Sequence, residues 1–227
     1  MPPSRSLFLL LMLALAAAQA QPPAAPPVAR TAGVRAEIDA LLAFRRGVRD
    51  PYGAMSGWDA ASPSAPCSWR GVACAPGGVG GRVVELQLPR LRLSGPISPE
   101  LGSLPYLERL SLRSNDLSGA VPATLARVTS LRAVFLQSNS LSGPIPQSFL
   151  ANLTNLDTFD VSGNLLSGPV PASLPPTLKY LDLSSNAFSG TIPASISASA
   201  PSLQFLNLSF NRLRGTVPAS LERLSTL

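Results

Sequence analysis

Apolar residues recur in a fixed pattern along residues 83–227. Each copy reads LxxLxLxxNxLxGx(I/V)P and begins with an LxL segment whose apolar residues are two positions apart, which is the spacing of a β-strand. Six copies start at residues 83, 107, 131, 156, 178 and 203, with spacings of 22 to 25 residues. A unit this short cannot bury its apolar face alone, so the pattern predicts a solenoid in which each copy adds one strand to a parallel sheet.

One polar position is fixed within this apolar pattern. An asparagine follows the strand of every copy except the first, where Leu91 takes its place. An amide can both donate to and accept from backbone groups that the turn leaves unpaired, so we expect an asparagine ladder through the core. The alternative, Asn as a simple turn former, does not require five copies in register. The ladder comprises Asn115, Asn139, Asn164, Asn186 and Asn211.

Residues 1–20 have the character of a secretory signal peptide. Arg5 precedes an apolar run from Leu7 to Leu15, and residues 18–20 read Ala-Gln-Ala, which suits a cleavage site. We therefore expect cleavage after Ala20. A membrane anchor is the alternative, but the run falls short of the roughly 20 strongly apolar residues that a spanning helix needs.

The segment between this leader and the repeats predicts a cap. Residues 21–34 are rich in Pro and Ala, and we expect an extended, poorly ordered lead-in. Residues 36–48 have helical spacing, with Glu37 and Asp39 near the start, where the helix dipole favours acids. Because the first copy would otherwise expose an apolar end, we expect residues 35–82 to cover it.

Cys67 and Cys74 are the only cysteines, and both lie just ahead of the first copy. In an exported chain a close, even pair predicts a disulfide, with two buried free thiols as the alternative. Closing so short a loop contributes roughly 2.5 kcal/mol on the chain-entropy model. Since the chain has no histidine, two cysteines cannot complete a tetrahedral site, and we expect no metal or other cofactor.

Two N-glycosylation sequons begin at Asn152 and Asn207. Asn152 falls between repeat cores, where we expect it on the outer side. Asn207 falls inside the strand of the sixth copy, where a glycan would mask part of the open sheet face.

Several of these motifs resemble the extracellular leucine-rich repeats of plant receptor-like kinases. They are the recurring SG(P/T/A)(I/V)P, the LSGPIP of residues 141–146 and the CSWRGVAC of residues 67–74. The resemblance covers residues 34–227 and implies an α/β solenoid, namely a right-handed superhelix with parallel strands on its concave face and an α-helical, disulfide-pinned N-terminal cap. It also implies a second strand around the (I/V)P segment and recognition of peptide or protein ligands on the inner and lateral surfaces.

The sequence departs from the family pattern at three places. Ser98 stands where other copies have Pro, and Pro175-Pro176 shorten the fourth copy, so we expect a tight turn on its outer side. A seventh copy begins at Leu227, which we expect of a fragment whose membrane span and kinase lie in a missing C-terminal segment. An open solenoid end predicts self-association of the isolated piece.

By alternation, the side chains between the strand leucines face solvent on the concave sheet. Phe135, Tyr180 and Phe205 are expected there as an aromatic column, next to a basic N-terminal end and two acids; Tyr and Arg are favoured anchors in interfaces. The alternative is an ordinary solvated face. The candidate ligand-binding residues are Arg109, Arg113, Phe135, Gln137, Asp160, Tyr180, Asp182 and Phe205.

Catalysis is not expected. Asp160 and Asp182 occupy the same strand position in successive copies, about 5 Å apart, which resembles a glycosidase pair. A flat open face, however, does not raise the pKa of an acid as a pocket does. The chain also has no histidine base, no GxSxG elbow and no phosphate-binding glycine loop.

The net charge of +6 is compatible with acidic partners such as pectic wall polymers or anionic membrane surfaces. The arginines are scattered and the leader directs export, so we expect no nucleic-acid partner.

The leading hypothesis is the ligand-sensing portion of a plant receptor kinase at the cell surface, with a peptide or protein ligand and a co-receptor ectodomain as partners. The alternatives are a free secreted inhibitor of wall-degrading enzymes, similar to polygalacturonase inhibitors, and, less favoured, an exported carbohydrate-active enzyme.

Overall fold

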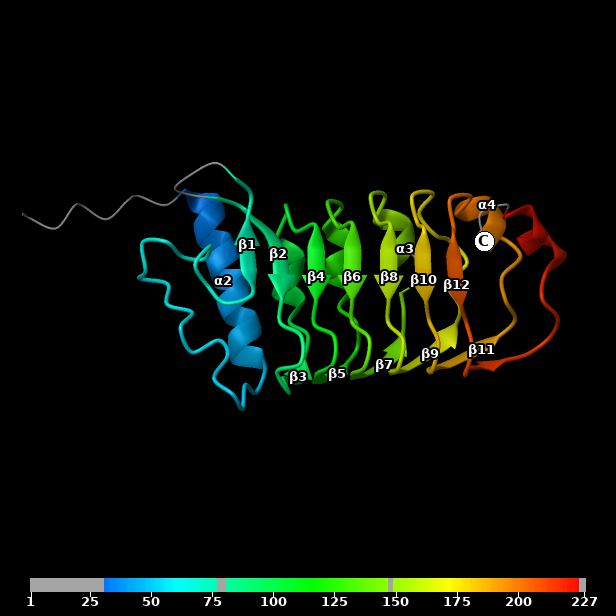
Figure 1. Cartoon of the computed structure of the whole chain (residues 1–227), viewed down its shortest axis with the longest axis horizontal. Helices are drawn as coiled ribbons and strands as arrows, with labels where there is room; N and C mark the ends of the chain where they lie inside the picture. Colours follow the sequence, from blue (N-terminus) through cyan, green and yellow to red (C-terminus); the bar gives the residue numbers. More distant parts are fainter. Residues whose placement is uncertain (1–30, 77–80, 147–148, 225–227) are drawn as a thin grey trace, which may run out of the picture.

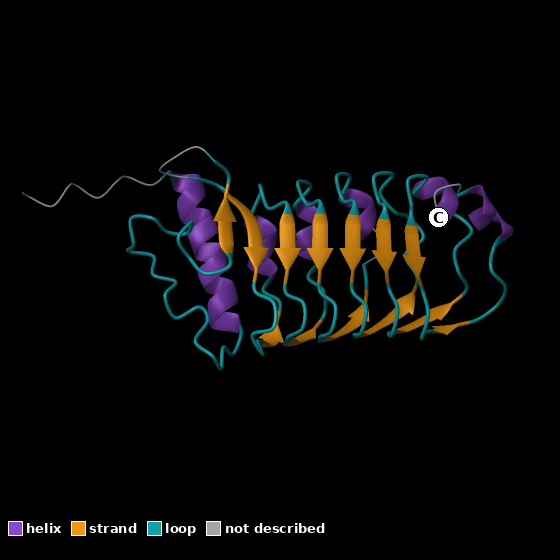
Figure 2. Cartoon of the chain, viewed as in Figure 1, coloured by secondary structure: helices purple, strands orange, loops and turns teal. Residues whose placement is uncertain are grey.

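The computed structural model describes residues 31–76, 81–146 and 149–224. The expected signal peptide, most of the lead-in and the start of a seventh copy lie outside these residues. The molecule is elongated, with the cap at one end and the copies side by side along the long axis (Figure 1). Short outer helices lie behind the strands (Figure 2).

The first sheet has seven strands in the order β1-β2-β4-β6-β8-β10-β12. Each of the six copies contributes one parallel strand, which confirms the predicted solenoid; β1, from the cap, pairs antiparallel with β2 and was not predicted. The strands are β1 (Val72–Cys74), β2 (Val83–Gln87), β4 (Arg109–Ser111), β6 (Ala133–Phe135), β8 (Thr158–Asp160), β10 (Tyr180–Asp182) and β12 (Phe205–Asn207).

A second parallel sheet runs along the lower edge of Figure 1, in the order β13-β11-β9-β7-β5-β3. Its strands end before the (I/V)P pair rather than around it. Gly143 of β7 has a φ of 80°, a conformation that glycine adopts at no steric cost. The strands are β3 (Ser94–Pro96), β5 (Asp116–Gly119), β7 (Ser140–Pro144), β9 (Leu165–Pro169), β11 (Ala187–Gly190) and β13 (Arg212–Leu213).

The outer side of each copy is a single short helical turn, except in the fourth copy. There the chain turns tightly and the Leu178 N–H donates to the Pro175 carbonyl at 3.1 Å, as the Pro175-Pro176 pair predicts. The turns of the other copies are η1 (Pro99–Ser103), η2 (Ala123–Arg127), α3 (Phe149–Asn152), α4 (Ile196–Ser199) and η3 (Ala219–Arg223).

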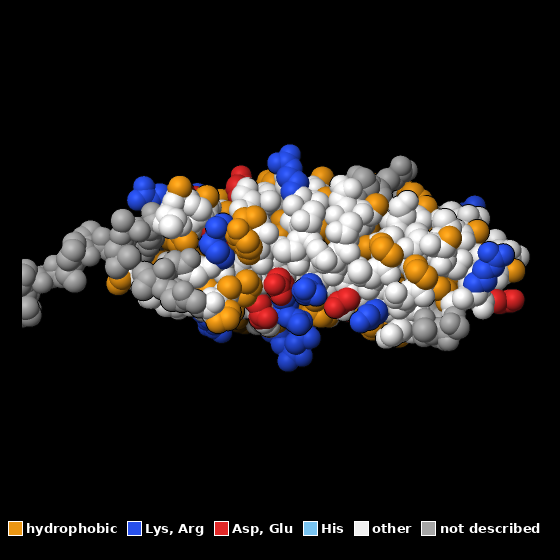
Figure 3. All heavy atoms as spheres, turned by 90° about the horizontal axis from the view of Figure 1, so that it is seen from above, with side chains coloured by type: hydrophobic (Ala, Val, Ile, Leu, Met, Phe, Trp, Pro, Cys, Tyr) orange, Lys and Arg blue, Asp and Glu red, His pale blue; other side chains and the backbone are white. Residues whose placement is uncertain are grey.

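Charged side chains are unevenly spread on the face from which the strands begin. Seen from above, they gather over the cap and the first copies, and a largely uncharged stretch precedes the last copy (Figure 3).

The asparagines after each strand tie neighbouring copies together. Asn164 Oδ1 accepts the Leu141 N–H at 3.0 Å, and Asn164 Nδ2 donates to the carbonyls of Leu136 and Val161, both at 3.0 Å. Each of these amides therefore binds backbone of its own copy and of the preceding one. The same arrangement recurs at Asn115, Asn139, Asn186 and Asn211.

The cap helix α2 (Ala32–Gly47) begins four residues before the expected start. Thr31 is its N-cap, and the Thr31 side chain accepts the Val34 N–H at 3.4 Å. Residues 32–34, expected in a poorly ordered lead-in, are therefore helical. Val34, Ile38, Leu41 and Phe44 of α2 are buried in one core that continues through the repeats.

The cap loop is closed by the Cys67–Cys74 disulfide, with the two Cα atoms 5.5 Å apart, which confirms the prediction. Beside it, the rings of Trp58 and Trp69 stack with centroids 5.1 Å apart. Their indole N–H groups donate to backbone carbonyls of the same loop, so the polar end of each buried ring is satisfied.

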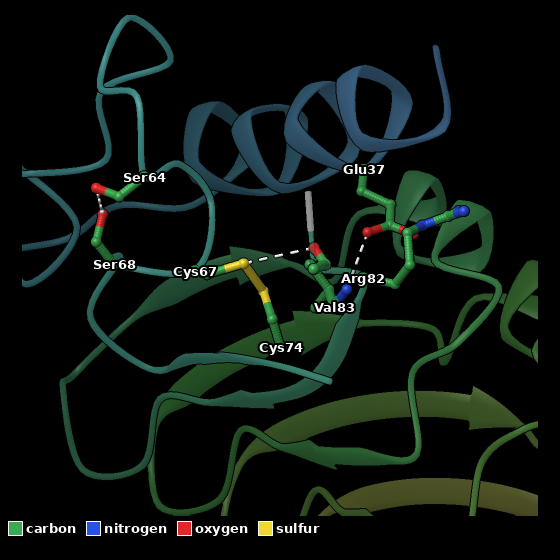
Figure 4. The surroundings of a disulfide bond; sticks show 8 residues. Glu37, Ser64, Cys67, Ser68, Cys74, Arg82 and Val83 are labelled. Atoms are coloured by element: carbon green, nitrogen blue, oxygen red, sulfur yellow. Dashed lines mark hydrogen bonds and ion pairs between the residues drawn. A yellow bond between two sulfur atoms is a disulfide. The ribbon is translucent and has the colours of Figure 1, made fainter. Parts of the chain in front are cut away.

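Glu37, expected near the helix start, connects the cap to the first copy and is completely buried. It points from α2 towards Arg82 and Val83 (Figure 4). Glu37 Oε1 accepts from Arg82 Nε at 2.7 Å, and Oε2 accepts the Val83 N–H at 2.9 Å. The Arg82 guanidinium also lies over the Tyr106 ring, 4.3 Å from its centroid.

Replacing Asn164 with Ala should lower the free energy of unfolding by about 3 kcal/mol, since a buried unpaired polar group costs about 1–3 kcal/mol and three backbone partners lose an amide. Urea unfolding measures this change. Asn211→Ala is the control, because Asn211 is only partly buried and water can replace part of its bonds. Equal losses in the two variants would contradict the burial argument.

Glu37→Ala should cost about 3–5 kcal/mol of unfolding free energy, because it leaves the Arg82 charge and the Val83 N–H without their partner. Glu37→Gln, which keeps an acceptor oxygen, should lose less. Thermal and urea unfolding of both variants test this, with Asp39→Asn on the exposed side of α2 as the control. A Glu37→Ala variant as stable as the control would refute the proposed role of the buried pair.

Candidate functional site

The concave face of the first sheet is organised in columns, because the parallel strands are in register. The first column holds the residue that opens each of β4, β6, β8, β10 and β12, together with Glu85 of β2, and the second holds the residue two positions later. The first column is Glu85, Arg109, Ala133, Thr158, Tyr180 and Phe205; the second is Gln87, Ser111, Phe135, Asp160, Asp182 and Asn207.

The three aromatic residues do not form one column, which corrects the expectation. Tyr180 and Phe205 are paired neighbours in the first column, and their rings stack with centroids 4.3 Å apart and an interplanar angle of 4°. Phe135 lies in the second column, opposite Asp160. The difference in column can be seen in the sequence. Phe135 is four residues after the first leucine of its copy, whereas Tyr180 and Phe205 are each two residues after theirs.

The two acids are neighbours on β8 and β10, and each is only 7% exposed. Asp160 Oδ1 accepts the Ser162 N–H at 3.0 Å and the Ser162 hydroxyl at 2.7 Å. Asp182 Oδ1 accepts the Ser184 N–H at 2.9 Å. A serine two residues after the acid therefore closes a local turn at both positions.

Asn207 continues this row on β12. Its Oδ1 accepts the Ser209 N–H at 3.2 Å and the Ser209 hydroxyl at 2.8 Å, and its Nδ2 donates to Asp182 Oδ2 at 3.2 Å. The sequence signal for this row is the serine that recurs two residues after the second-column residue in the last three copies.

Burial raises the pKa of the Asp160 carboxyl above its ordinary value. The hydrogen bonds from Ser162 oppose this effect, the Asp182 charge adds to it, and Arg113 has the smallest influence. The pKa of Tyr180 is raised as well, first by burial and then by the two nearby carboxylates. The face is therefore a partly desolvated, electronegative surface between β8 and β12.

The opposite end of the face is polar and charged. The exposed Arg109 lies 3.6 Å from Glu85 across neighbouring strands, and its guanidinium is 5.8 Å from the Phe135 ring centroid. Arg113 is exposed, whereas Gln137 is partly buried and its Oε1 is without a hydrogen-bond partner among the described residues.

Asn152 lies at the exposed end of α3, on the outer side. Asn207 lies on the concave face, where its side chain is already hydrogen-bonded to Asp182 and Ser209. Glycosylation at either residue stays a prediction.

One feature on the other side of the solenoid was not predicted. A groove of about 470 Å³ lies next to the shortened fourth copy, with Ile145, Pro169, Val170, Pro171 and Pro193 among its lining residues.

Within the described ranges, no group of three or more acidic or cysteine side chains is placed to hold a metal ion. No helix there has the length and apolarity that a membrane crossing requires.

Comparison with known proteins agrees with this geometry. Residues 35–75 match the family described as a leucine rich repeat N-terminal domain, and residues 177–199 and 202–224 match the leucine rich repeat. A rice protein (Oryza sativa subsp. japonica) named "Probable inactive leucine-rich repeat receptor kinase XIAO" is 77% identical over 150 residues, which are 66% of this chain. The chain spans 13% of the length of that relative.

Two solved Arabidopsis structures share the fold. The ectodomain of the receptor kinase SOBIR1 is 31% identical with a TM-score of 0.66, covering 81% of this chain and 97% of that one. The receptor kinase HAESA, solved in complex with the peptide hormone IDA and the co-receptor SERK1, is 32% identical with a TM-score of 0.76, covering 84% of this chain and 32% of that one. The shared fold is a binding fold without catalytic function.

Asp160→Asn should raise thermal stability at neutral pH, since the raised pKa means that the charged carboxylate is less favourable in the folded chain than in the unfolded one. The loss of stability from ionising Asp160 is complete above the pKa that its carboxyl has in the folded chain. It disappears as the pH falls below the pKa of the same group in the unfolded chain. The melting temperatures of variant and wild type should therefore converge on acidification. A constant difference across the pH series would show that ionisation of Asp160 is not its cause.

Proposed function

The chain belongs to the family of extracellular leucine-rich-repeat regions of plant receptor kinases, and we propose that it is the ligand-recognition portion of such a receptor. Its work is binding, and signalling across the membrane belongs to other segments of the parent protein. The expected leader and the extracellular character of the family support export through the secretory pathway to the outer face of the plasma membrane.

The concave face supports peptide or protein binding most directly. It exposes the stacked Tyr180–Phe205 pair next to the desolvated acids Asp160 and Asp182, with Phe205 39% exposed. Rigid aromatic rings with polar groups at their edge are the composition of binding hot spots. This juxtaposition is the observation that carries the proposal. The relatives reported above are receptor kinases or their ectodomains, which favours recognition over inhibition of a wall-degrading enzyme.

A second partner is a co-receptor ectodomain. HAESA, whose fold this chain shares, is solved together with both a peptide hormone and the co-receptor SERK1. By analogy, we propose that a peptide held on the concave face completes a surface for a co-receptor on the lateral side.

The triple replacement of Phe135, Tyr180 and Phe205 by Ala in the receptor ectodomain should weaken peptide binding at least about tenfold, since aromatic anchors contribute most of the affinity of an interface. Binding is measured by calorimetry with peptides selected on the wild type from a random-sequence library. The matched control replaces Tyr52, Leu165 and Val217, three exposed apolar residues away from the face, by Ala. Unchanged affinity in the concave variant would refute the assignment of the face.

A further inference from the structure

Asp160 and Asp182 have no ion-pair partner among the described residues, and the Arg113 charge has only a small effect on Asp160. The ion pairs within the described residues are Glu37–Arg82, Glu85–Arg109 and Glu108–Arg132, so neither acid has a basic partner within ion-pair distance. Two partly desolvated like charges on neighbouring strands repel each other, and a cation placed against them relieves both the repulsion and the lost hydration.

Two side-chain oxygen atoms of the concave face are also free to accept a hydrogen bond from a ligand. Asp160 Oδ1 is occupied by Ser162, but Asp160 Oδ2 accepts no hydrogen bond from the part of the chain that the structure describes. Gln137 lies two residues after the end of β6, and its Oε1 is buried and is unpaired among those same residues. A buried acceptor without a donor is rare in a native protein, and a ligand rich in N–H groups would satisfy it.

The stacked pair of Tyr180 and Phe205 is placed to contact the flat face of a guanidinium, a group rich in N–H donors. Tyr180 precedes Asp182 by two residues on β10, so it faces the same side of the sheet, and Phe205 stacks on it from β12. A guanidinium binds carboxylates through its edge and aromatic rings through its face.

We propose that Asp160, Asp182, Tyr180 and Phe205 form a seat for a cationic side chain, an arginine or a lysine, of a peptide ligand. The proposal rests on the proposed function, since it names the chemistry of the ligand that the concave face recognises. A metal ion is a poorer occupant, because the described part of the chain offers no third acidic or cysteine ligand there.

The neighbouring strand shows which substitution removes the charge without disturbing the turn. Asn207 sits in the column of the two acids, and its Oδ1 accepts from the Ser209 N–H and hydroxyl as Asp160 Oδ1 does from Ser162. Asp160→Asn with Asp182→Asn therefore preserves the bonds from Ser162 and Ser184, and it loses the bond that Asn207 Nδ2 donates to Asp182 Oδ2. The matched control, Asp39→Asn with Asp116→Asn, makes the same change in net charge at two exposed residues outside the seat.

The test uses a library of random-sequence peptides, acetylated and amidated so that every cation is a side chain. Selection on the wild-type chain should enrich Arg or Lys, and the enrichment should persist on the control and vanish on the Asp160→Asn/Asp182→Asn variant. For a selected peptide, norleucine in place of the basic residue should weaken binding to the wild type at least about tenfold and leave binding to the variant unchanged. A cooperative melting transition in both variant and control shows that the fold is kept.

Two other outcomes separate the two proposals. Selected peptides without basic residues, or with the same affinity for the variant as for the wild type, would overturn the cation seat and leave peptide recognition standing. A wild-type chain that selects no peptide would overturn both.

Discussion

Every copy of this solenoid depends on its neighbours for hydrogen bonds as well as for apolar contacts. The asparagine after each strand illustrates the dependence, since Asn164 binds the carbonyl of Val161 in its own copy and groups of the preceding copy. An amide with both donors and acceptors meets this need at a buried turn, where water is excluded. The ladder therefore fixes the spacing and the register of successive copies together.

This constraint is what gives the concave face its chemistry. Once the strands are held in register, residues at the same offset in successive copies become spatial neighbours. Tyr180 and Phe205 stack for this reason, and Asp160 and Asp182 lie next to each other for the same reason. A column of unlike side chains offers a ligand different contacts along its length. The asparagine column is uniform, and it stabilises the fold.

The sequence predicted the parts of the structure that repeat or that depend on residues close together in the chain. Strand positions, the tight turn at Pro175 and the disulfide follow from local patterns, because period and spacing determine them directly. The interactions of Glu37 did not follow, since its partners Arg82 and Val83 lie about 45 residues away and no periodicity relates them. The helix start at Ala32 was missed because a Pro- and Ala-rich segment obscures the N-cap at Thr31.

The cap shows why these non-repeating interactions matter. An end copy has a neighbour on one side only, so its exposed face needs a substitute that repeats cannot provide. The substitute is apolar along Val34, Leu41 and Phe44, but apolar contacts alone do not fix a unique orientation. The bonds from Glu37 to the Arg82 side chain and to the Val83 N–H constrain that orientation, since hydrogen bonds depend on direction as well as distance. The buried carboxylate therefore fixes the cap against the first strand, whereas the asparagine ladder holds the later strands in the register that builds the binding face.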